Sequence, residues 1–389
     1  MAVLARVVRT RRVRAGLAQL VFVFVGLGAG FAVTRIAWGP RVASAQVIDT
    51  LLAIGLGVLG AVAVIFSLLF LVVQWVTTAF TPRLMLFRDD PIVWRTFGFA
   101  LGLAVFCVTA ALAIGKQPEV SAGVPLLAMV LVLVQIALLR TLQLRAFSAI
   151  QLAPALGAIA ARGRKVLGAA YPEHGEVSPA RSPLLPPHMS VVWQHPPMVL
   201  QRVEVDRLID VATAANAVIV VWQSPGATLH RGSRVADVYG GKLSEASVLQ
   251  GLIVGNERTF DQDPLLAFRL LADIALRAVS SAVNDPATAV QAFDELGDLL
   301  GSVAATRLDP LRRTDHNGVE RLVIDLPGWE EFLRTGVDDI MYAANAPMVV
   351  TALRDMLRRV RDRADPDRTE LIDQRLTWLD DRVTERNLT

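Results

Sequence analysis

Charge is nearly absent from four long stretches in the first part of this chain, and each stretch has the length of a membrane helix. The four stretches are Gly16–Trp38, Asp49–Val76, Phe97–Gly115 and Gly123–Leu139. An α-helix needs about 20 apolar residues to cross the hydrocarbon layer of a bilayer, which is ~30 Å thick. We therefore predict a membrane α-helical region with four transmembrane helices over residues 16–145, preceded by a basic segment at residues 1–15.

Beyond residue 145 the mixture of charged and apolar residues is that of an ordinary soluble protein. The hydrophobic content of 53% is thus an average over two different regions. Five prolines follow the basic stretch Ala160–Val166 and predict a juxtamembrane linker over residues 146–188. These prolines are Pro172, Pro179, Pro183, Pro186 and Pro187. The remaining residues, 189–389, are predicted to form a C-terminal α+β soluble domain.

The basic residues beside the predicted helices indicate an orientation. Five arginines precede the first helix and others follow the second and fourth, whereas the two remaining loops contain Arg41 and Lys116. Basic loops stay on the cytoplasmic side of an inner membrane, so both termini and the C-terminal domain are predicted to be cytoplasmic. The first apolar stretch is longer than a secretory signal core and predicts a retained helix, with a cleaved signal peptide as the alternative.

Polar side chains inside the predicted spans are few. No Asp, Glu or His lies in the middle of a span, and Gln135 is expected near the end of the fourth. Ionisable groups within the membrane mark proton and ion pathways, so this pattern argues against an ion-coupled carrier. It leaves open a pore lined by apolar residues of several subunits.

Two pairs of glycines at helix-packing spacing lie in the first and third spans. They are Gly26 with Gly30, and Gly98 with Gly102. Such pairs let two helix backbones approach closely in lipid. They predict either packing within one four-helix bundle or contacts between the subunits of a homo-oligomer.

Hydrophobic periodicity in the C-terminal domain predicts both strands and helices, an α+β pattern. The predicted strands are Ser190–Gln194, Val199–Val203, Ala217–Gln223, Arg234–Val238 and Arg321–Leu326. The predicted helices are Asp206–Ala215, Trp329–Asn345, Met348–Arg363 and Asp365–Arg386. Two further helices are expected within residues 255–300, the segment richest in polar motifs.

Aspartate-proline dipeptides predict the starts of helices, because Asp is a favoured N-cap and Pro suits the first helical position. They occur at Asp263-Pro264, Asp285-Pro286, Asp309-Pro310 and Asp365-Pro366. In the helix after the first of these, Arg269, Asp273 and Arg277 follow at intervals of four and share one face. That face is either a solvated strip of ion pairs or part of a ligand site.

The tripeptide Asn284-Asp285-Pro286 joins two apolar helices and predicts a tight turn. The turn is either a capped structural turn or a place where Asn284 and Asp285 contact a ligand or a cation. The full set of candidate ligand-binding residues is Arg258, Asp263, Arg269, Asp273, Arg277, Asn284, Asp285 and Thr288.

Several function classes lack their signatures in this sequence. The single cysteine, Cys107, excludes a disulfide framework and a cysteine metal site, and the five histidines lack metal-ligand spacing. No phosphate-binding glycine loop, dinucleotide fingerprint or nucleophile elbow is present. The small net charge of +3 does not indicate a nucleic-acid partner. We therefore predict no catalytic residue, no metal and no cofactor.

The motifs of residues 255–300 resemble those of a known family. They are Glu257-Arg258-Thr259, Gln262-Asp263, Asp273-Ile274-Ala275-Leu276-Arg277-Ala278 and Asn284-Asp285-Pro286-Ala287-Thr288-Ala289. Their order resembles the bacterial family of predicted membrane proteins known as domain of unknown function 2254, over nearly the whole chain. The resemblance implies a membrane location and brings no activity with it.

These observations favour a non-enzymatic inner-membrane protein whose cytoplasmic domain senses a ligand or binds a partner protein. The expected partners are the lipid bilayer, further copies of the chain, and an unidentified cytoplasmic ligand or protein. One alternative is an oligomeric channel or transport component gated by the cytoplasmic domain. Another is a membrane-tethered hydrolase that uses Mg²⁺ bound by Asp261, Asp263, Asp273 and Asp285.

Overall fold

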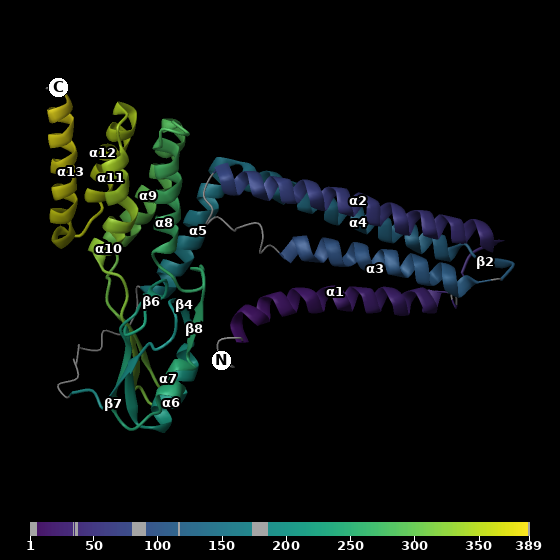
Figure 1. The fold of residues 1–389 in the computed structure, drawn as a ribbon, viewed down its shortest axis with the longest axis horizontal. Coiled ribbons are helices and arrows are strands. Elements are labelled where there is room, and N and C mark those ends of the chain that lie inside the picture. The colour runs from purple at the N-terminus through teal and green to yellow at the C-terminus, as the bar shows by residue number, and fades with distance from the viewer. Residues whose placement is uncertain are drawn as a thin grey trace. The chain divides into compact units, whose positions relative to one another are not determined.

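The structure is a computed structural model that describes residues 6–33, 35, 38–79, 91–115, 117–172 and 186–387. The chain divides into two compact units (Figure 1). One unit is formed by Val8–Gln151, and the other is formed mainly by Leu152–Thr389.

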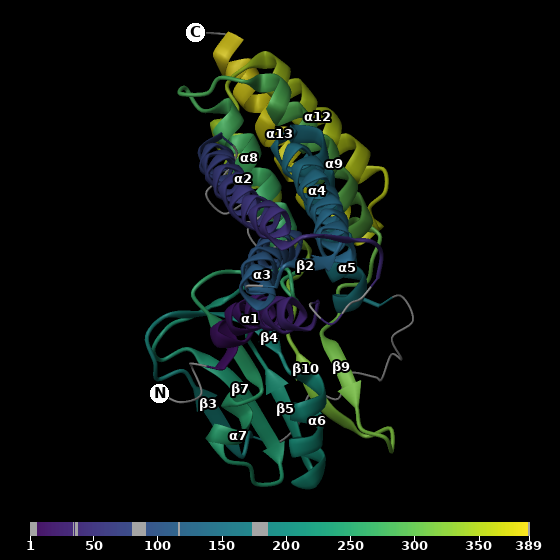
Figure 2. The ribbon, with the colours of Figure 1, turned by 90° about the vertical axis from the view of Figure 1, so that its right-hand side faces the viewer.

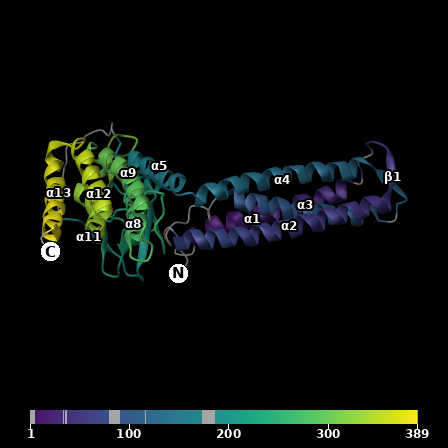
Figure 3. The ribbon, with the colours of Figure 1, turned by 90° about the horizontal axis from the view of Figure 1, so that it is seen from above.

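Among the described residues, helices α1 to α4 make up most of the first unit (Figure 3). They are α1 (Arg6–Val33), α2 (Ser44–Ala79), α3 (Pro91–Ile114) and α4 (Gly123–Ile150). Three of them contain stretches that are long and apolar enough to cross a membrane, namely Ser44–Leu71, Ile92–Ile114 and Gly123–Arg145. The apolar part of α1 is shorter, Gln19–Val33, and the helix ends five residues before the predicted Trp38.

A two-stranded sheet that the sequence did not predict joins the connections at one end of this unit. Strand β1 (Arg41–Ala43) pairs antiparallel with β2 (Glu119–Ser121), with Val42 opposite Val120. Three residues are too few to show an alternating pattern, so the sequence carries no signal for either strand. The pairing ties the α1–α2 connection to the α3–α4 connection.

The four predicted packing glycines lie where α1 contacts α3 within the same chain. A side chain at Gly26 would overlap the backbone of Gly102, and a Cβ at Gly102 would lie 2.6 Å from the carbonyl oxygen of Phe22. Gly98 lies against the Phe22 ring, and Gly30 lies against Thr109. The absence of side chains therefore lets the two backbones touch, as in other close helix contacts in lipid.

Gln135 lies inside the helical unit, which corrects the expectation that it sits near the end of a span. The fourth apolar stretch continues to Arg145, beyond the predicted Leu139, so Gln135 is close to its middle. The residue is 2% exposed, and neither atom of its amide has a hydrogen-bond partner in the part of the chain that the structure describes. A buried amide without a partner costs free energy, and more so in lipid.

Replacing Gln135 with leucine is expected to stabilise the protein by about 1–3 kcal/mol, because the substitution removes a buried polar group without a partner. The measurement is thermal unfolding of the full chain in detergent. Gln143→Leu, at an exposed position of the same helix, is the matched control and should change little. A destabilising Gln135→Leu would show that the amide has a partner in the membrane.

One part of the C-terminal unit is built from two β-sheets. The five-stranded sheet has the order β3-β7-β5-β10-β9 (Figure 2), and the three-stranded sheet has the order β6-β4-β8. The strands are β3 (Met189–Val192), β4 (Met198–Val203), β5 (Ala217–Val221), β6 (Thr228–Leu229), β7 (Arg234–Gly240), β8 (Leu252–Gly255), β9 (Leu311–Thr314) and β10 (Glu320–Ile324). Strands β5 and β10 are parallel, with Ile219 opposite Leu322, and the other pairs are antiparallel.

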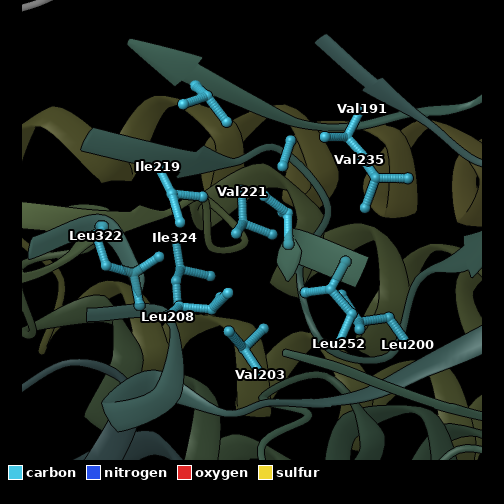
Figure 4. Packing of buried hydrophobic residues seen from close by; sticks show 14 of the residues in the cluster. Val191, Leu200, Val203, Leu208, Ile219, Val221, Val235, Leu252, Leu322 and Ile324 are labelled. Carbon is cyan, nitrogen blue, oxygen red and sulfur yellow. The ribbon is translucent and has the colours of Figure 1, made fainter. Parts of the chain in front are cut away.

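The hydrophobic core of this part lies between the two sheets and α6 (Val205–Ala214). Strand β5 has the sequence Ala-Val-Ile-Val-Val, whose β-branched side chains suit a pleated, buried surface. Figure 4 shows the packing; its labelled residues are Val191, Leu200, Val203, Leu208, Ile219, Val221, Val235, Leu252, Leu322 and Ile324. A short helix, α7 (Glu245–Leu249), adds Val248 to the same core.

Helices make up the rest of the C-terminal unit. They are α5 (Leu152–Ala170), α8 (Leu266–Val279), α9 (Pro286–Ala304), α10 (Trp329–Leu333), α11 (Asp339–Ala343), α12 (Pro347–Arg361) and α13 (Pro366–Asn387). A π-helical turn, η1 (Arg334–Asp338), joins α10 to α11, so the predicted helix Trp329–Asn345 is one helical segment with a local widening. Gly336 of this turn lies against Leu296 and Phe268.

Three expectations differ from the fold. Helix α8 begins at Leu266, with Leu265 rather than Asp263 at the N-cap position. The region expected to be an irregular linker contains α5, whose buried residues, such as Leu156, Ile159 and Leu167, recur at helical spacing. Its basic residues lie on the exposed face of the helix. Asp309-Pro310 does not start a helix, because strand β9 follows it. The predicted linker residues 173–185 lie outside the described part of the chain.

Candidate functional site

The carboxylate of Asp263 accepts hydrogen bonds that connect the loop after β8 to the start of α8. Asp263 is 2% exposed, and its carboxylate accepts two hydrogen bonds from Arg258, from Nε at 2.6 Å and from a terminal nitrogen at 2.8 Å. The backbone N–H of Leu265 donates to the same carboxylate at 3.1 Å. Burial raises the pKa of Asp263 against the opposing effect of these hydrogen bonds. A carboxylate satisfied in this way holds local structure and has little capacity left for a ligand.

The Pro225-Gly226 turn depends on the same carboxylate. Gly226 has a φ of +98°, which favours glycine, and a side chain there would overlap the Asp263 carboxylate. Asp263 therefore connects three segments: this turn, the Arg258 loop and the start of α8.

The other candidate residues lie further along α8 and in the turn after it. Arg269 pairs with Asp273 at 2.9 Å and with Asp339 of α11 at 3.0 Å, so it ties α8 to α11. Arg277 lies in the last turn of α8, and within the described residues its buried Nε has no hydrogen-bond partner. Asn284 has a φ of +49° in the tight turn.

Asp285 is the N-cap of α9, and Pro286 is the first residue of that helix. Its carboxylate accepts hydrogen bonds from the Thr288 backbone N–H at 3.2 Å and from the Thr288 hydroxyl at 2.6 Å. These bonds hold the pKa of Asp285 below its usual value. The geometry is that of a capped helix start.

Substituting Asp285 with alanine is expected to lower the free energy of unfolding by about 1 kcal/mol, the usual loss for an N-cap. Because the folded-state pKa is lowered, this contribution is present at neutral pH and shrinks as the pH falls below about 4. Denaturant unfolding at two pH values measures both effects. Asp285→Asn, which can still cap, is the control; equal losses in both variants would contradict a capping role.

The eight candidate residues therefore do not form one site. Arg258 and Asp263 lie before α8, Arg269 and Asp273 lie in its middle, and Asp285 and Thr288 lie beyond its end. The 14 residues of α8 span roughly 20 Å at 1.5 Å per residue. Among the residues the structure describes, no three Asp, Glu, His or Cys side chains lie close enough together to hold a metal ion.

A cavity of about 680 Å³ lies elsewhere in the C-terminal unit, between α5, α9 and the approach to β9. Its apolar wall is formed by buried side chains, chiefly Leu167, Tyr171 and Val303. The full lining is Arg164, Leu167, Gly168, Tyr171, Pro172, Ser302, Val303, Thr306, Leu308 and Arg313. Ligand pockets typically have volumes of about 300–1,000 Å³ and combine apolar walls with a few polar groups.

Two guanidinium groups give the cavity a positive charge, and none of its described lining residues is acidic. Arg164 donates to Asp298, which does not line the cavity, at 2.9 Å. Arg313 donates to the carbonyl oxygen of Arg312 at 2.9 Å and has no carboxylate partner among the described residues. Its neighbour Arg312, by contrast, pairs with Glu320 at 2.8 Å.

Tyr171 contributes a ring to the wall of the cavity and keeps its proton. Its hydroxyl donates to the carbonyl oxygen of Pro327 at 2.7 Å. Burial, with the nearby carboxylates of Glu331 and Asp325, raises the pKa of Tyr171 well above its usual value. The cavity lining thus combines a neutral aromatic ring with Arg313, which has no carboxylate partner among the described residues, and Arg164, which is paired with Asp298.

Comparison with known proteins identifies a family. The model of the family described as "Predicted membrane protein (DUF2254)" matches residues 14–359. The chain belongs to this family. Uncharacterized proteins of Mycobacterium tuberculosis and Mycobacterium bovis are each 27% identical to it over 391 residues, which cover 89% of this chain and 71% of each relative. No solved structure matches the chain.

The family match covers all three helices that are long and apolar enough to cross a membrane, as well as both sheets. It also covers every residue that lines the cavity. The candidate cavity is thus inside the family region of the protein.

The cavity cannot be predicted from a sequence motif, because its walls come from three separate segments. Helix α5 lies in the expected linker, β9 was not predicted, and the cavity residues Ser302 and Thr306 carry no motif. The buried positions of α5, which recur at a spacing of three and four, were the one available signal.

Proposed function

We propose that the protein is a membrane-anchored receptor that takes up a small ligand in the cavity between α5, α9 and β9. The observation that supports this proposal is the cavity itself, with its apolar wall, its volume of about 680 Å³ and its two arginines. Three of the four carboxylates on which the hydrolase alternative depends, Asp263, Asp273 and Asp285, have partners at separate positions.

The connection between the two units supports a role in sensing. Helix α5, which forms one wall of the cavity, begins at Leu152, and α4 ends at Ile150. Gln151 alone separates them, in an extended conformation. A ligand that shifts α5 would thus act on the segment that directly continues a membrane helix.

Native mass spectrometry of the full chain in nanodiscs tests the receptor proposal. We expect a small-molecule adduct on the wild-type protein and its loss in Gly168→Phe, because Gly168 lines the cavity and a Cβ there meets open space. Ala169→Phe, at an exposed position on the same helix that does not line the cavity, should keep the adduct. A symmetric oligomer without any adduct would overturn the receptor and favour an oligomeric channel.

The proposal includes four membrane helices, with α1 as the fourth, and a cytoplasmic C-terminal domain. It rests on the packing of α1 against α3 and on the basic residues beside the helices. In a Cys107→Ser background, a membrane-impermeant maleimide should label Arg41→Cys in intact cells. His230→Cys should react only after permeabilisation. The opposite pattern would reverse the orientation.

A further inference from the structure

We infer that the ligand of the cavity is an anionic amphiphile: a carboxylate or phosphate head on an alkyl chain. This inference rests on the proposed function, because it names the class of molecule that the same cavity would take. It depends on the charge of the cavity and on how its polar and apolar groups are distributed.

The apolar part of the lining suits an alkyl chain. Leu167, Tyr171 and Val303 line the cavity with little exposed surface, and the more exposed Leu308 and Pro172 extend the same apolar lining. Burying a methylene group against such a wall contributes stabilisation from the hydrophobic effect. A small polar metabolite would leave this wall unused.

The polar part of the lining suits an anion. Arg313 lines the cavity, and the hydrogen bond that its guanidinium group makes in the described structure is to the backbone carbonyl of Arg312. A guanidinium fork matches the geometry of carboxylate and phosphate oxygens. Ser302 and Thr306 add hydroxyl groups to the lining, although the Thr306 hydroxyl already donates to the Ser302 carbonyl oxygen at 2.8 Å.

Arg164 has a secondary part in this arrangement. It already pairs with Asp298, which also lies 3.6 Å from Arg363. An anionic head in the cavity would compete with Asp298 for Arg164, whereas Arg313 has no such competitor. Arg313 is therefore the residue expected to select the charge of the ligand.

Photo-crosslinking of the full chain in phosphatidylcholine nanodiscs tests the class of ligand. The probe is a twelve-carbon alkyl phosphate that carries a diazirine, and the labelled peptides are mapped by mass spectrometry. We expect labelling of peptides from α5 and the end of α9, with competition by dodecyl phosphate and none by dodecyltrimethylammonium. Inorganic phosphate alone should compete at least about tenfold more weakly than dodecyl phosphate, because it lacks the alkyl chain.

Arg313→Gln should weaken the labelling at least about tenfold, because a hydrogen bond to a charged group is lost. Arg312→Gln is the matched control, since Arg312 is adjacent, is paired with Glu320 and does not line the cavity. It should leave the labelling unchanged. Equal labelling of the wild type and Arg313→Gln, or equal competition by the cationic amphiphile, would overturn the inference.

The two proposals fail in different ways. If Gly168→Phe abolishes labelling but Arg313→Gln does not, the cavity binds a ligand without selecting an anion, and the receptor proposal stands alone. If neither variant changes the labelling, both proposals fail.

Nanodiscs that contain phosphatidylglycerol distinguish the source of the ligand. Competition by this lipid indicates that the ligand is a bilayer lipid, and retained labelling without competition indicates a single-chain amphiphile from solution. Both of these results support the anionic class.

Discussion

Replacing Asp263 with alanine is expected to lower the free energy of unfolding of the C-terminal unit by about 2–3 kcal/mol, because a buried carboxylate that accepts charge-assisted hydrogen bonds is removed. The Asp263 side chain is almost fully buried, and Arg258 would keep its charge without a partner. The turn at Gly226 and the start of α8 would lose the same contact. Thermal and denaturant unfolding of the full chain, followed by tryptophan fluorescence, measure the effect.

Two comparisons make this prediction specific. Asp294→Ala removes an exposed carboxylate from a 3.3 Å pair with Arg359 and should cost less than about 1 kcal/mol. The double variant Arg258→Ala/Asp263→Ala should lose less than the sum of the two single variants, because it leaves no unpaired charge. A loss in Asp263→Ala no larger than that in Asp294→Ala would contradict this role of the Asp263 carboxylate.

Leucine at Gly102 is expected to separate α1 from α3 and to destabilise the membrane unit by at least about 1–3 kcal/mol. The added Cβ would lie 2.6 Å from the Phe22 carbonyl oxygen, and no change of side-chain rotamer can relieve a contact with backbone. Thermal unfolding in detergent measures the loss, and a disulfide engineered across the α1–α3 contact in a Cys107→Ser background should form less efficiently in the variant.

Gly28→Leu is the matched control for Gly102→Leu. Gly28 lies in α1, and a Cβ added there meets nothing within 4 Å in the described structure. This substitution should be neutral or slightly stabilising, since leucine favours a helix by nearly 1 kcal/mol relative to glycine. If Gly28→Leu is as harmful as Gly102→Leu, α1 uses a different face, for example against another subunit.

Much of the C-terminal fold could be predicted from local patterns. Strand β5 begins at the predicted Ala217, and α6 lies within one residue of the predicted helix. In both segments the spacing of the apolar residues indicates the secondary structure without reference to the rest of the chain. Strand β9 was missed because Arg312 and Arg313 give it no apolar alternation. Helix α5 was missed because its basic residues and the prolines after it resemble a linker.

The candidate site was less predictable, for a physical reason. Motifs such as Asp285-Pro286 and the Arg269–Asp273 pair are local, and the structure shows that local motifs here form caps and ion pairs. The cavity forms only when α5, α9 and β9 come together. Its most informative residue, Arg313, is distinguished from Arg312 by the absence of a carboxylate partner in the described structure, and no sequence pattern encodes that difference.

The parallel pairing of β5 with β10 has a consequence for how the protein is made. During synthesis, β5 emerges about 100 residues before β10, and the antiparallel β9–β10 pair must then add to the free edge of β5. Contacts between distant segments form slowly and leave unpaired strand edges exposed in the meantime. The helices of the first unit are synthesised before this step, and one edge of β5 stays unpaired until β9 and β10 have been made. A stop codon before residue 320 would remove β10 and leave one edge of β5 unpaired, which we expect to favour unfolding and degradation of the truncated product.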